Sequence, residues 1–380
     1  MKLIYSKNAV CIAKGFKAAA VASGLKKSGK LDLALLYSQS PTVACGVFTK
    51  NKFPAAPVLI CRKHLKAKQT RAIVVNSGNA NCFTGKEGLK AGFKTADKAA
   101  SLLGLKITDV LVASTGIIGK QMDFAKINTA LAGLAANLDA GGGSRLARAI
   151  MTTDTTSKEV YTTINIGSKK VTLGGCAKGA GMIAPDMATM LCFITTDASI
   201  TYPALQRALK EAVESSFNLI SIDGCMSTND SVIVLANGLA RNEMIRLSDS
   251  SFTKFASALK EICLALAKMV VMDAEGISKF IAISVAGAKD NAQAKKCALQ
   301  IANSNLFKAA MYGENPNFGR IVAAVGASGV KVKAGLKIKC SPLKGKNIKV
   351  MVDLMVGKGK ATVYTSDLTP EYVRINAEYN

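Results

Sequence analysis

The chain has 380 residues, and hydrophobic residues make up 49% of it, which excludes wholesale disorder and predicts more than one core. Its formal net charge is +25, yet the lysines are spread along the whole sequence and form no long basic block. Aromatic residues account for only 6% and tryptophan is absent, so stacking platforms for nucleic acid are scarce. A lysine-rich surface is therefore favoured over a nucleic-acid-binding face, which stays open as an alternative.

Targeting signals and metal-binding motifs are also missing from the sequence. The most apolar stretch, residues 262–272, is interrupted by Lys268 and is too short to span a bilayer. Residues 1–7 lack the apolar run of a signal peptide, so a cytoplasmic protein with no membrane partner is expected. The 10 cysteines stand singly and His64 is the only histidine, so we expect no metal site and mostly buried, reduced thiols.

The first hundred residues predict strands joined by turns and one helix. A turn at Gly24–Lys26 precedes a buried strand at 32–36. Residues 24–30 follow P-loop spacing, but Leu31 stands where Ser or Thr should bind magnesium, which indicates a solvated turn. Residues 72–81 predict a strand that breaks into an Asn/Gly loop, for which turn chemistry alone is a sufficient explanation. Apolar residues at helical spacing predict an amphipathic helix over 88–103.

The next segments continue the alternation of strands and helices. Residues 110–119 predict a strand that ends in a tight turn at Thr115–Gly116, and a helix is expected over 123–138. A glycine loop at 141–143 then leads to a short helix capped by Ser144. Residues 152–155 read Thr-Thr-Asp-Thr and are also compatible with a threonine ladder on a strand. Residues 159–175 alternate as a hairpin.

A glycine-rich loop near the middle of the chain runs into a strand. Residues 178–190 cannot easily form a helix interior because glycine is costly there, and 191–197 predict a buried strand. Thr189 is therefore expected at the end of the loop, just before a rigid strand. This position suits a nucleophile, because the strand would hold its hydroxyl in place.

The second half predicts three helices and two groups of strands. The helices are expected at 202–217, 251–269 and 289–311, and the strands at 280–286 and within 336–366. Glu275 lies between a helix and a strand. Its carboxylate could pair with the ammonium of an amino-acid substrate, although a solvated turn residue is the alternative.

Residues 178–191 closely resemble the cleavage and active-site segment of the ornithine acetyltransferase family, the bifunctional glutamate N-acetyltransferases of arginine biosynthesis. Further blocks resemble the family in one collinear order, at 46–58, 72–81, 110–119, 151–155, 221–230, 272–279, 312–320 and 367–380. The chain departs from the family pattern at Ala180, Asp186, Cys225, Asn315 and Phe318. The family's last substrate contact has no counterpart, since the sequence stops at Asn380.

The resemblance implies an α/β fold, a layered αββα sandwich similar to N-terminal-nucleophile hydrolases with a smaller C-terminal α/β domain. We place the domains at 1–285 and 286–380. It also implies self-cleavage between Ala188 and Thr189 into an α fragment, 1–188, and a β fragment from 189. Two copies of each fragment would form a heterotetramer.

The same resemblance assigns roles to residues of this chain. Thr189 corresponds to the nucleophile, and Thr115 and Gly116 to the oxyanion hole. The expected substrate contacts are Thr155, Lys178, Thr189, Glu275 and Asn376. The substrates would be N2-acetyl-L-ornithine and L-glutamate, with no metal and no cofactor, and acetyl-CoA is a candidate second acetyl donor.

The mechanism expected for such a protein does not need a histidine. Because His64 lies far from Thr189 in the sequence, a Ser/His/Asp triad is not expected. A threonine hydroxyl needs an adjacent base, and an N-terminal α-amine is one. We therefore expect ping-pong transfer through acetyl-Thr189. The rivals are a self-processing aminopeptidase, in which water or an amine replaces glutamate, and a basic nucleic-acid-binding protein.

Overall fold

The computed structural model describes residues 2–184 and 190–378. The chain divides into two compact units. Unit 1 contains Met1–Gly179, Thr189–Ser216 and Ser227–Leu266, and unit 2 contains Ala180–Ala188, Phe217–Met226 and Ala267–Asn380. Each unit combines several separate segments of the sequence. The domains placed at 1–285 and 286–380 from the sequence stay a prediction.

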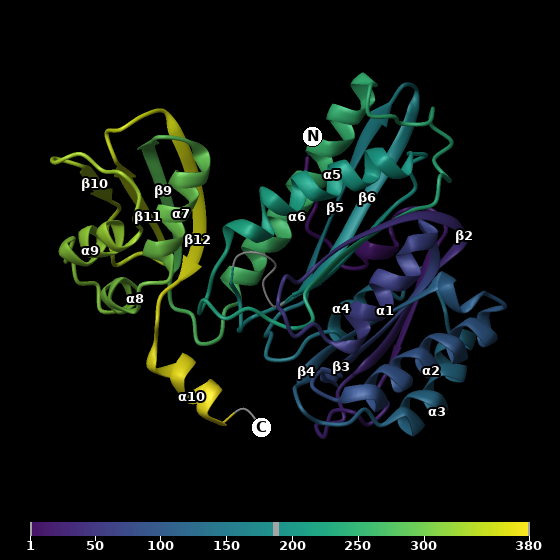
Figure 1. Ribbon diagram of the computed structural model, residues 1–380. Coiled ribbons are helices and arrows are strands. Elements are labelled where there is room, and N and C mark those ends of the chain that lie inside the picture. The colour runs from purple at the N-terminus through teal and green to yellow at the C-terminus, as the bar shows by residue number, and fades with distance from the viewer. Residues whose placement is uncertain (1, 185–189, 379–380) are drawn as a thin grey trace. The chain divides into compact units, whose positions relative to one another are not determined.

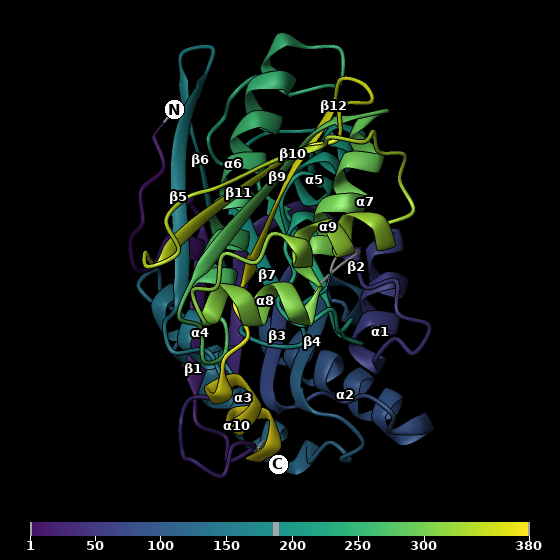
Figure 2. The same ribbon diagram turned by 90° about the vertical axis from the view of Figure 1, so that its left-hand side faces the viewer.

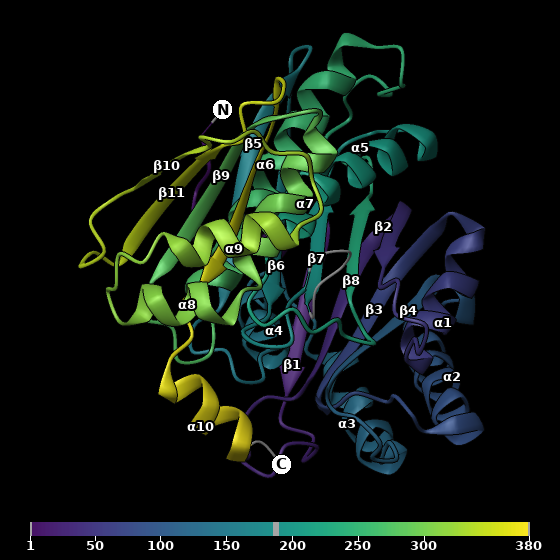
Figure 3. The same cartoon turned by 60° about the vertical axis from the view of Figure 1, so that its left-hand side comes forward.

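Unit 1 is built on one eight-stranded sheet, as far as the described residues go. The strand order is β4-β3-β2-β8-β7-β6-β5, and β1 pairs with β2 outside this path. The long strand β2 joins the two halves, because its first part pairs with β1 and β3 and its last part, Val43–Phe48, pairs with β8. Figure 3 shows β8 between β2 and β7. The strands are β1 (Phe16–Val21), β2 (Leu33–Phe48), β3 (Gln69–Asn79), β4 (Val110–Ile117), β5 (Lys158–Ile166), β6 (Lys169–Lys178), β7 (Leu191–Thr196) and β8 (Ser231–Ala236).

Helices pack on the outer surfaces of the two halves of this sheet. Helices α2 and α3 lie beside β3 and β4 (Figure 1) and bury their apolar faces in one core with β1–β4. On the other half, α5 packs on β2. Helix α6 lies so close to β6 that a Cβ added to Gly175 would be 3.3 Å from Leu266 Cδ1. The helices are α1 (Ala56–His64), α2 (Gly85–Leu103), α3 (Phe124–Ala136), α4 (Gly143–Ala149), α5 (Tyr202–Glu214) and α6 (Ser250–Met272), which continues into unit 2.

A second core in unit 1 joins side chains from both halves of the sheet. It contains Leu36, Val75 and Leu111 from the first half and Phe193 and Ile233 from the second, all almost fully buried. Since strands place alternate side chains on opposite faces, each half has one face on this core and one on the outer helices. The unit is thus layered as helix, sheet, sheet and helix, and the mixed α/β class expected from the sequence is confirmed.

Unit 2 contains a four-stranded sheet in the order β10-β11-β9-β12. Strands β11 and β9 are parallel, and the other pairs are antiparallel. Helix α7 packs on β9 and β12 and α9 packs on α7, so these helices cover one face of the sheet (Figure 2). The elements are β9 (Phe280–Ala288), α7 (Asn291–Ala302), α8 (Asn305–Tyr312), α9 (Gly319–Ala327), β10 (Lys337–Cys340), β11 (Asn347–Asp353), β12 (Gly359–Ser366) and α10 (Pro370–Glu378).

Two predicted details of the helices were wrong, and an alternative left open for residues 152–155 is excluded. The single helix expected over 289–311 is two helices, because Ser304 accepts a hydrogen bond from the Phe307 amide at 3.3 Å and starts α8. Ser144 does not cap α4; the Gly143 amide instead donates to Asn8 Oδ1 at 2.7 Å. Residues 152–155 form no strand ladder and lie in a loop.

Candidate functional site

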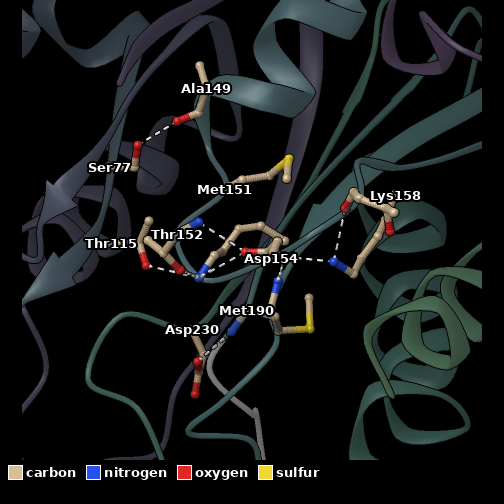
Figure 4. Close-up of polar contacts among 12 residues, drawn as sticks. Ser77, Thr115, Ala149, Met151, Thr152, Asp154, Lys158, Met190 and Asp230 are labelled. Carbon is tan, nitrogen blue, oxygen red and sulfur yellow. Dashed lines mark hydrogen bonds and ion pairs between the residues drawn. The ribbon is translucent and has the colours of Figure 1, made fainter. Parts of the chain in front are cut away.

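Lys178 ends β6 with its side chain buried in unit 1, where it is only 3% exposed. Its ammonium donates to Thr152 Oγ1 at 2.7 Å and to Thr115 Oγ1 at 3.4 Å. The Asp154 carboxylate lies 3.9 Å from the same nitrogen. Figure 4 labels Thr115, Thr152 and Asp154 and marks the polar contacts of this cluster with dashed lines. The structure thus brings two predicted site residues, Thr115 and Lys178, into contact.

Asp154 is the buried counter-charge of this cluster. Its Oδ1 accepts hydrogen bonds from Lys158 Nζ and from the Gly179 amide, both at 2.7 Å, and Oδ2 accepts from the Thr152 amide at 3.0 Å. Burial by itself would raise the pKa of Asp154, but the charges of Lys178 and Lys158 and these hydrogen bonds outweigh burial and hold that pKa well below its usual range. The carboxylate is therefore ionised, and it compensates two ammonium groups that sit away from water.

Thr115 and Gly116 lie near the end of β4, where it runs parallel to β3. The tight turn that spacing suggested is instead a continuation of the strand to Ile117. Lys178 donates to Thr115 Oγ1, so the hydroxyl proton of Thr115 is directed elsewhere and can be donated to an anion. Gly116 has a φ of 131°, a conformation that side-chain-bearing residues rarely adopt.

Ala188 and Thr189, the predicted cleavage site and nucleophile, lie outside the described residues. The next residue, Met190, donates its amide to Asp230 Oδ1 at 3.0 Å, and its carbonyl accepts from the Ser231 amide at 3.0 Å. Burial raises the pKa of Asp230 well above its ordinary value, against the opposing effects of the Met190 amide, Thr49 and Lys178. A fully buried carboxyl group, whose ionisation is disfavoured by burial, therefore fixes the residue that follows Thr189.

Glu275 and Asn376 lie in unit 2 and contact each other. Asn376 Nδ2 donates to Glu275 Oε2 at 2.8 Å, and the Glu275 amide donates to the Ala180 carbonyl at 2.9 Å. A Cβ on Gly181 would meet Glu275 Oε2 at 2.2 Å, so a larger residue there would displace this carboxylate. The start of the glycine-rich loop is thus packed against a predicted substrate contact.

Asp223 fixes the following part of the same loop. Its carboxylate accepts from the amides of Met182 at 2.7 Å and Ile183 at 2.9 Å. It also accepts from the Cys225 amide at 3.0 Å and from the Tyr372 hydroxyl at 3.2 Å. One carboxylate therefore anchors the last described residues before the cleavage segment.

Five residues that hold this site were not predicted from the sequence, namely Thr152, Asp154, Lys158, Asp223 and Asp230. The Thr-Thr-Asp-Thr run gave a usable signal, because an acidic residue needs a cationic partner when it is buried, and Lys158 follows Asp154 by four positions. Thr155, the member of that run chosen from the resemblance, is exposed in the same loop. Asp223 and Asp230 carried no spacing signal that separates them from loop residues.

The positions that depart from the family pattern have ordinary local roles. Ala180 accepts the Glu275 hydrogen bond, Cys225 is the exposed thiol among mostly buried ones, and the Asn315 amide donates to the Ala310 carbonyl at 2.9 Å. Phe318 precedes α9 without a side-chain cap. Asp186 lies outside the described residues.

The described residues contain neither a cluster of metal ligands nor a helix that could span a membrane. No three His, Cys, Asp or Glu side chains there gather closely enough to hold a metal ion. None of the helices in that part of the chain combines the length and apolar character needed to cross a bilayer.

The fold and site define a mixed α/β protein with a buried lysine–carboxylate–threonine cluster directly before a glycine-rich loop. The profile of the ArgJ family matches residues 17–342 and 337–380. The arginine biosynthesis bifunctional protein ArgJ of Geobacter sulfurreducens is 42% identical over 388 residues, which cover 96% of this chain and 99% of that protein. The ArgJ protein of Dehalococcoides mccartyi is 44% identical over 391 residues, covering 96% of each chain.

A solved structure of ornithine acetyltransferase from Mycobacterium tuberculosis, complexed with ornithine, is 35% identical with a TM-score of 0.46. That match covers 50% of this chain and 100% of the other. The family profile and the near full-length relatives show that this chain belongs to the ArgJ family.

Proposed function

We propose that this chain is a self-processing glutamate N-acetyltransferase that moves acetyl from N2-acetyl-L-ornithine to L-glutamate. Membership of the ArgJ family carries this proposal, since near full-length relatives bear the name arginine biosynthesis bifunctional protein. The cluster of Lys178, Thr115 and Asp154 supports it, because it lies where the sequence leads into the segment predicted to be cleaved.

Self-cleavage is the first proposed step. The Thr189 hydroxyl attacks the Ala188 carbonyl carbon, and the peptide bond is replaced by an ester as the Thr189 nitrogen leaves with a proton. Water then hydrolyses the ester, which gives a carboxylate on Ala188 and a free α-amine on Thr189. That amine is the base that the hydroxyl lacks in the intact chain.

Acetyl transfer follows in two halves. The Thr189 hydroxyl attacks the acetyl carbonyl of N2-acetylornithine while its α-amine accepts the proton, and ornithine leaves after taking a proton back. The amine of glutamate then attacks the carbonyl carbon of acetyl-Thr189 and gives up a proton to the α-amine. N-acetylglutamate leaves as the bond between the acetyl group and the Thr189 oxygen breaks, and that oxygen regains its proton. In both halves the carbonyl oxygen becomes negative, and the Thr115 hydroxyl and Gly116 amide would donate to it. Loss of one such donor typically costs about 2.7–4 kcal/mol of transition-state stabilisation.

Lys178 has two roles in this scheme. By donating to Thr115 Oγ1 it orients the proton of that hydroxyl toward the reacting oxygen. Its positive charge, which lies 3.9 Å from the Asp154 carboxylate, also favours a negative transition state. Thr155, Glu275 and Asn376 are proposed substrate contacts, no metal or cofactor takes part, and acetyl-CoA is proposed as a second acetyl donor. We further propose a cytoplasmic assembly of two α and two β fragments.

Mass spectrometry of purified active protein tests the scheme. Two fragments are expected, one that ends at Ala188 and one that begins at Thr189. Acetyl label from acetylornithine should attach to Thr189. Thr189→Ala should stay in one piece and transfer no acetyl, whereas Thr129→Ala, an exposed helical position, should process normally. Intact protein with full activity would contradict the proposal.

A further inference from the structure

A cavity of about 320 Å³ in unit 1 is lined mainly by residues 26–31 and 148–154. Three of its lining residues are basic, namely Lys26, Lys30 and Arg148. Thr152 and Asp154 also line it, and both contact Lys178. We call this cavity the basic pocket. It lies next to the cluster described above, but none of its three cations belongs to the site residues expected from the sequence.

The charge of the basic pocket is not neutralised by its own lining. Among the described lining residues, Asp154 carries the only carboxylate. That group is already engaged by Lys158, by the Thr152 and Gly179 amides and by Lys178. Three positive charges therefore face a cavity whose single negative charge is directed to other partners.

The three cations are held in different ways. Lys26 is half-buried, and its ammonium is fixed in the wall by the carbonyls of Met151 at 2.7 Å and Leu31 at 2.8 Å. Lys30 and Arg148 are exposed, and their side chains make no hydrogen bond or ion pair within the described residues. Lys26 thus supplies a fixed charge, while the other two have donors free for a ligand.

We propose that the basic pocket binds a small anionic group, a carboxylate or a phosphate, carried by a substrate. Its volume is near the lower end of ligand pockets, about 300–1,000 Å³, so it suits a compact anion and is too small for a whole coenzyme. This inference rests on the proposed function, which supplies two candidate sources of the anionic group. They are the side-chain carboxylate of glutamate and the phosphates of acetyl-CoA. Arginine and lysine recognise either group.

The ionisation of Lys26 gives this proposal a pH signature. Burial lowers the pKa of Lys26 to about 8, helped by the charges of Lys178 and Lys30 and opposed by Asp32 and Asp154. Lys30 and Arg148, the latter near the end of α4, are the other basic groups that line the same pocket. An anion in the pocket favours the charged form, so binding near pH 8 takes up protons and affinity falls as the pH rises through that value.

Calorimetric titration of the purified full-length protein tests the pocket, with inorganic pyrophosphate and glutarate as probes. At least one probe should bind, with proton uptake near pH 8 and weaker affinity at high salt. The double variant Lys30→Gln/Arg148→Gln should bind about tenfold more weakly or worse. The control Lys86→Gln/Arg246→Gln makes the same charge change at exposed positions outside the pocket and should bind within about twofold of wild type.

Absence of binding by the wild-type protein, or equal binding by the pocket double variant, would overturn the inference. Kinetics then separate the two sources. A raised KM for glutamate with either donor identifies the carboxylate, and a raised KM for acetyl-CoA alone identifies the phosphates. Unchanged KM values for both would mean that the pocket serves neither substrate. If the wild type transfers no acetyl at all, the proposed function fails, while calorimetry still decides whether the pocket binds anions.

Discussion

Gly116 faces Gly78 across the parallel strands β4 and β3, so closely that a Cβ on Gly116 would lie 2.5 Å from the Gly78 carbonyl carbon. Backbone atoms cannot retreat as a flexible side chain can. The close approach also fixes the amide of Gly116, which we propose as an oxyanion donor. The demand for glycine at this position therefore comes from packing as well as from its φ of 131°.

A series of three Gly→Ala changes separates these effects. Gly116→Ala combines strain with a clash and should cost at least about 3 kcal/mol of unfolding free energy. Gly104→Ala has positive φ but open space, and should cost about 1–2 kcal/mol. Gly133→Ala, inside a helix with open space, should gain up to about 1 kcal/mol. Urea unfolding measures all three, and equal losses at 116 and 104 would show that the clash does not matter.

Asp154→Asn should be strongly destabilising, because it removes a carboxylate that the fully buried Lys158 and the nearly buried Lys178 both contact. Breaking a buried ion pair by removing one partner typically costs about 3–5 kcal/mol. Glu87→Gln breaks an exposed pair with Lys90 and should cost no more than about 1 kcal/mol. Unfolding of both variants at pH 7 gives the comparison.

The stabilisation that Asp154 gives the folded protein should change with pH in a definite direction. The folded-state pKa of Asp154 is lowered, so its stabilisation is present in full above the ordinary carboxyl value of 3.8 and is lost as the pH falls toward the folded value. The stability gap between wild type and Asp154→Asn should therefore narrow in acid. A gap that stays constant between pH 7 and pH 3 would contradict the buried ion-pair assignment.

Asp223→Asn should slow the proposed self-cleavage without unfolding unit 2. The amide retains one acceptor oxygen, so at least one of the hydrogen bonds from Met182 and Ile183 is lost and the loop is less well fixed. We expect fragments to form about tenfold more slowly, since a net hydrogen bond to a charged group is worth about 1.5 kcal/mol or more.

Two further variants serve as comparisons for the cleavage rate of Asp223→Asn. Tyr372→Phe removes only the hydroxyl contact to Asp223 and should have a smaller effect. Asp353→Asn removes a carboxylate that accepts the Met355 amide in another turn of unit 2, and should leave the rate unchanged. Gel densitometry of freshly purified protein follows the fragments. Cleavage of Asp223→Asn at the wild-type rate would remove any role for this anchor.

The sequence was most informative where a local rule coincides with burial. The strand expected at 191–197 is β7, buried along its whole length, and the 159–175 hairpin is β5 and β6. Local rules failed where the partner of a group is distant in the sequence. The Gly143 amide is satisfied by Asn8, 135 positions earlier, so the predicted Ser144 cap was not needed.

The same limit applies to the candidate site. Pattern and resemblance selected Lys178 and Thr115, because they stand in recognisable blocks. The network that holds them depends on Asp154 contacting Lys158 and Gly179, and nothing in the spacing tells which buried carboxylate meets which ammonium. The basic pocket likewise forms only when residues 26–31 fold against residues 148–154, which begin at the end of α4.

Lys308 provides a last prediction, about stability in base. Its side chain is buried in unit 2 against Thr365 and Ser366. Burial lowers its pKa from 10.5 to about 8, although Asp367 and Asp223 oppose the shift. Between these values the unfolded chain binds one more proton than the folded protein, so this residue makes unfolding free energy rise with pH, by up to about 1.4 kcal/mol per pH unit. Lys308→Met should remove that slope, and the exposed control Lys86→Met should keep it. Parallel slopes for wild type and Lys308→Met would show that Lys308 stays charged.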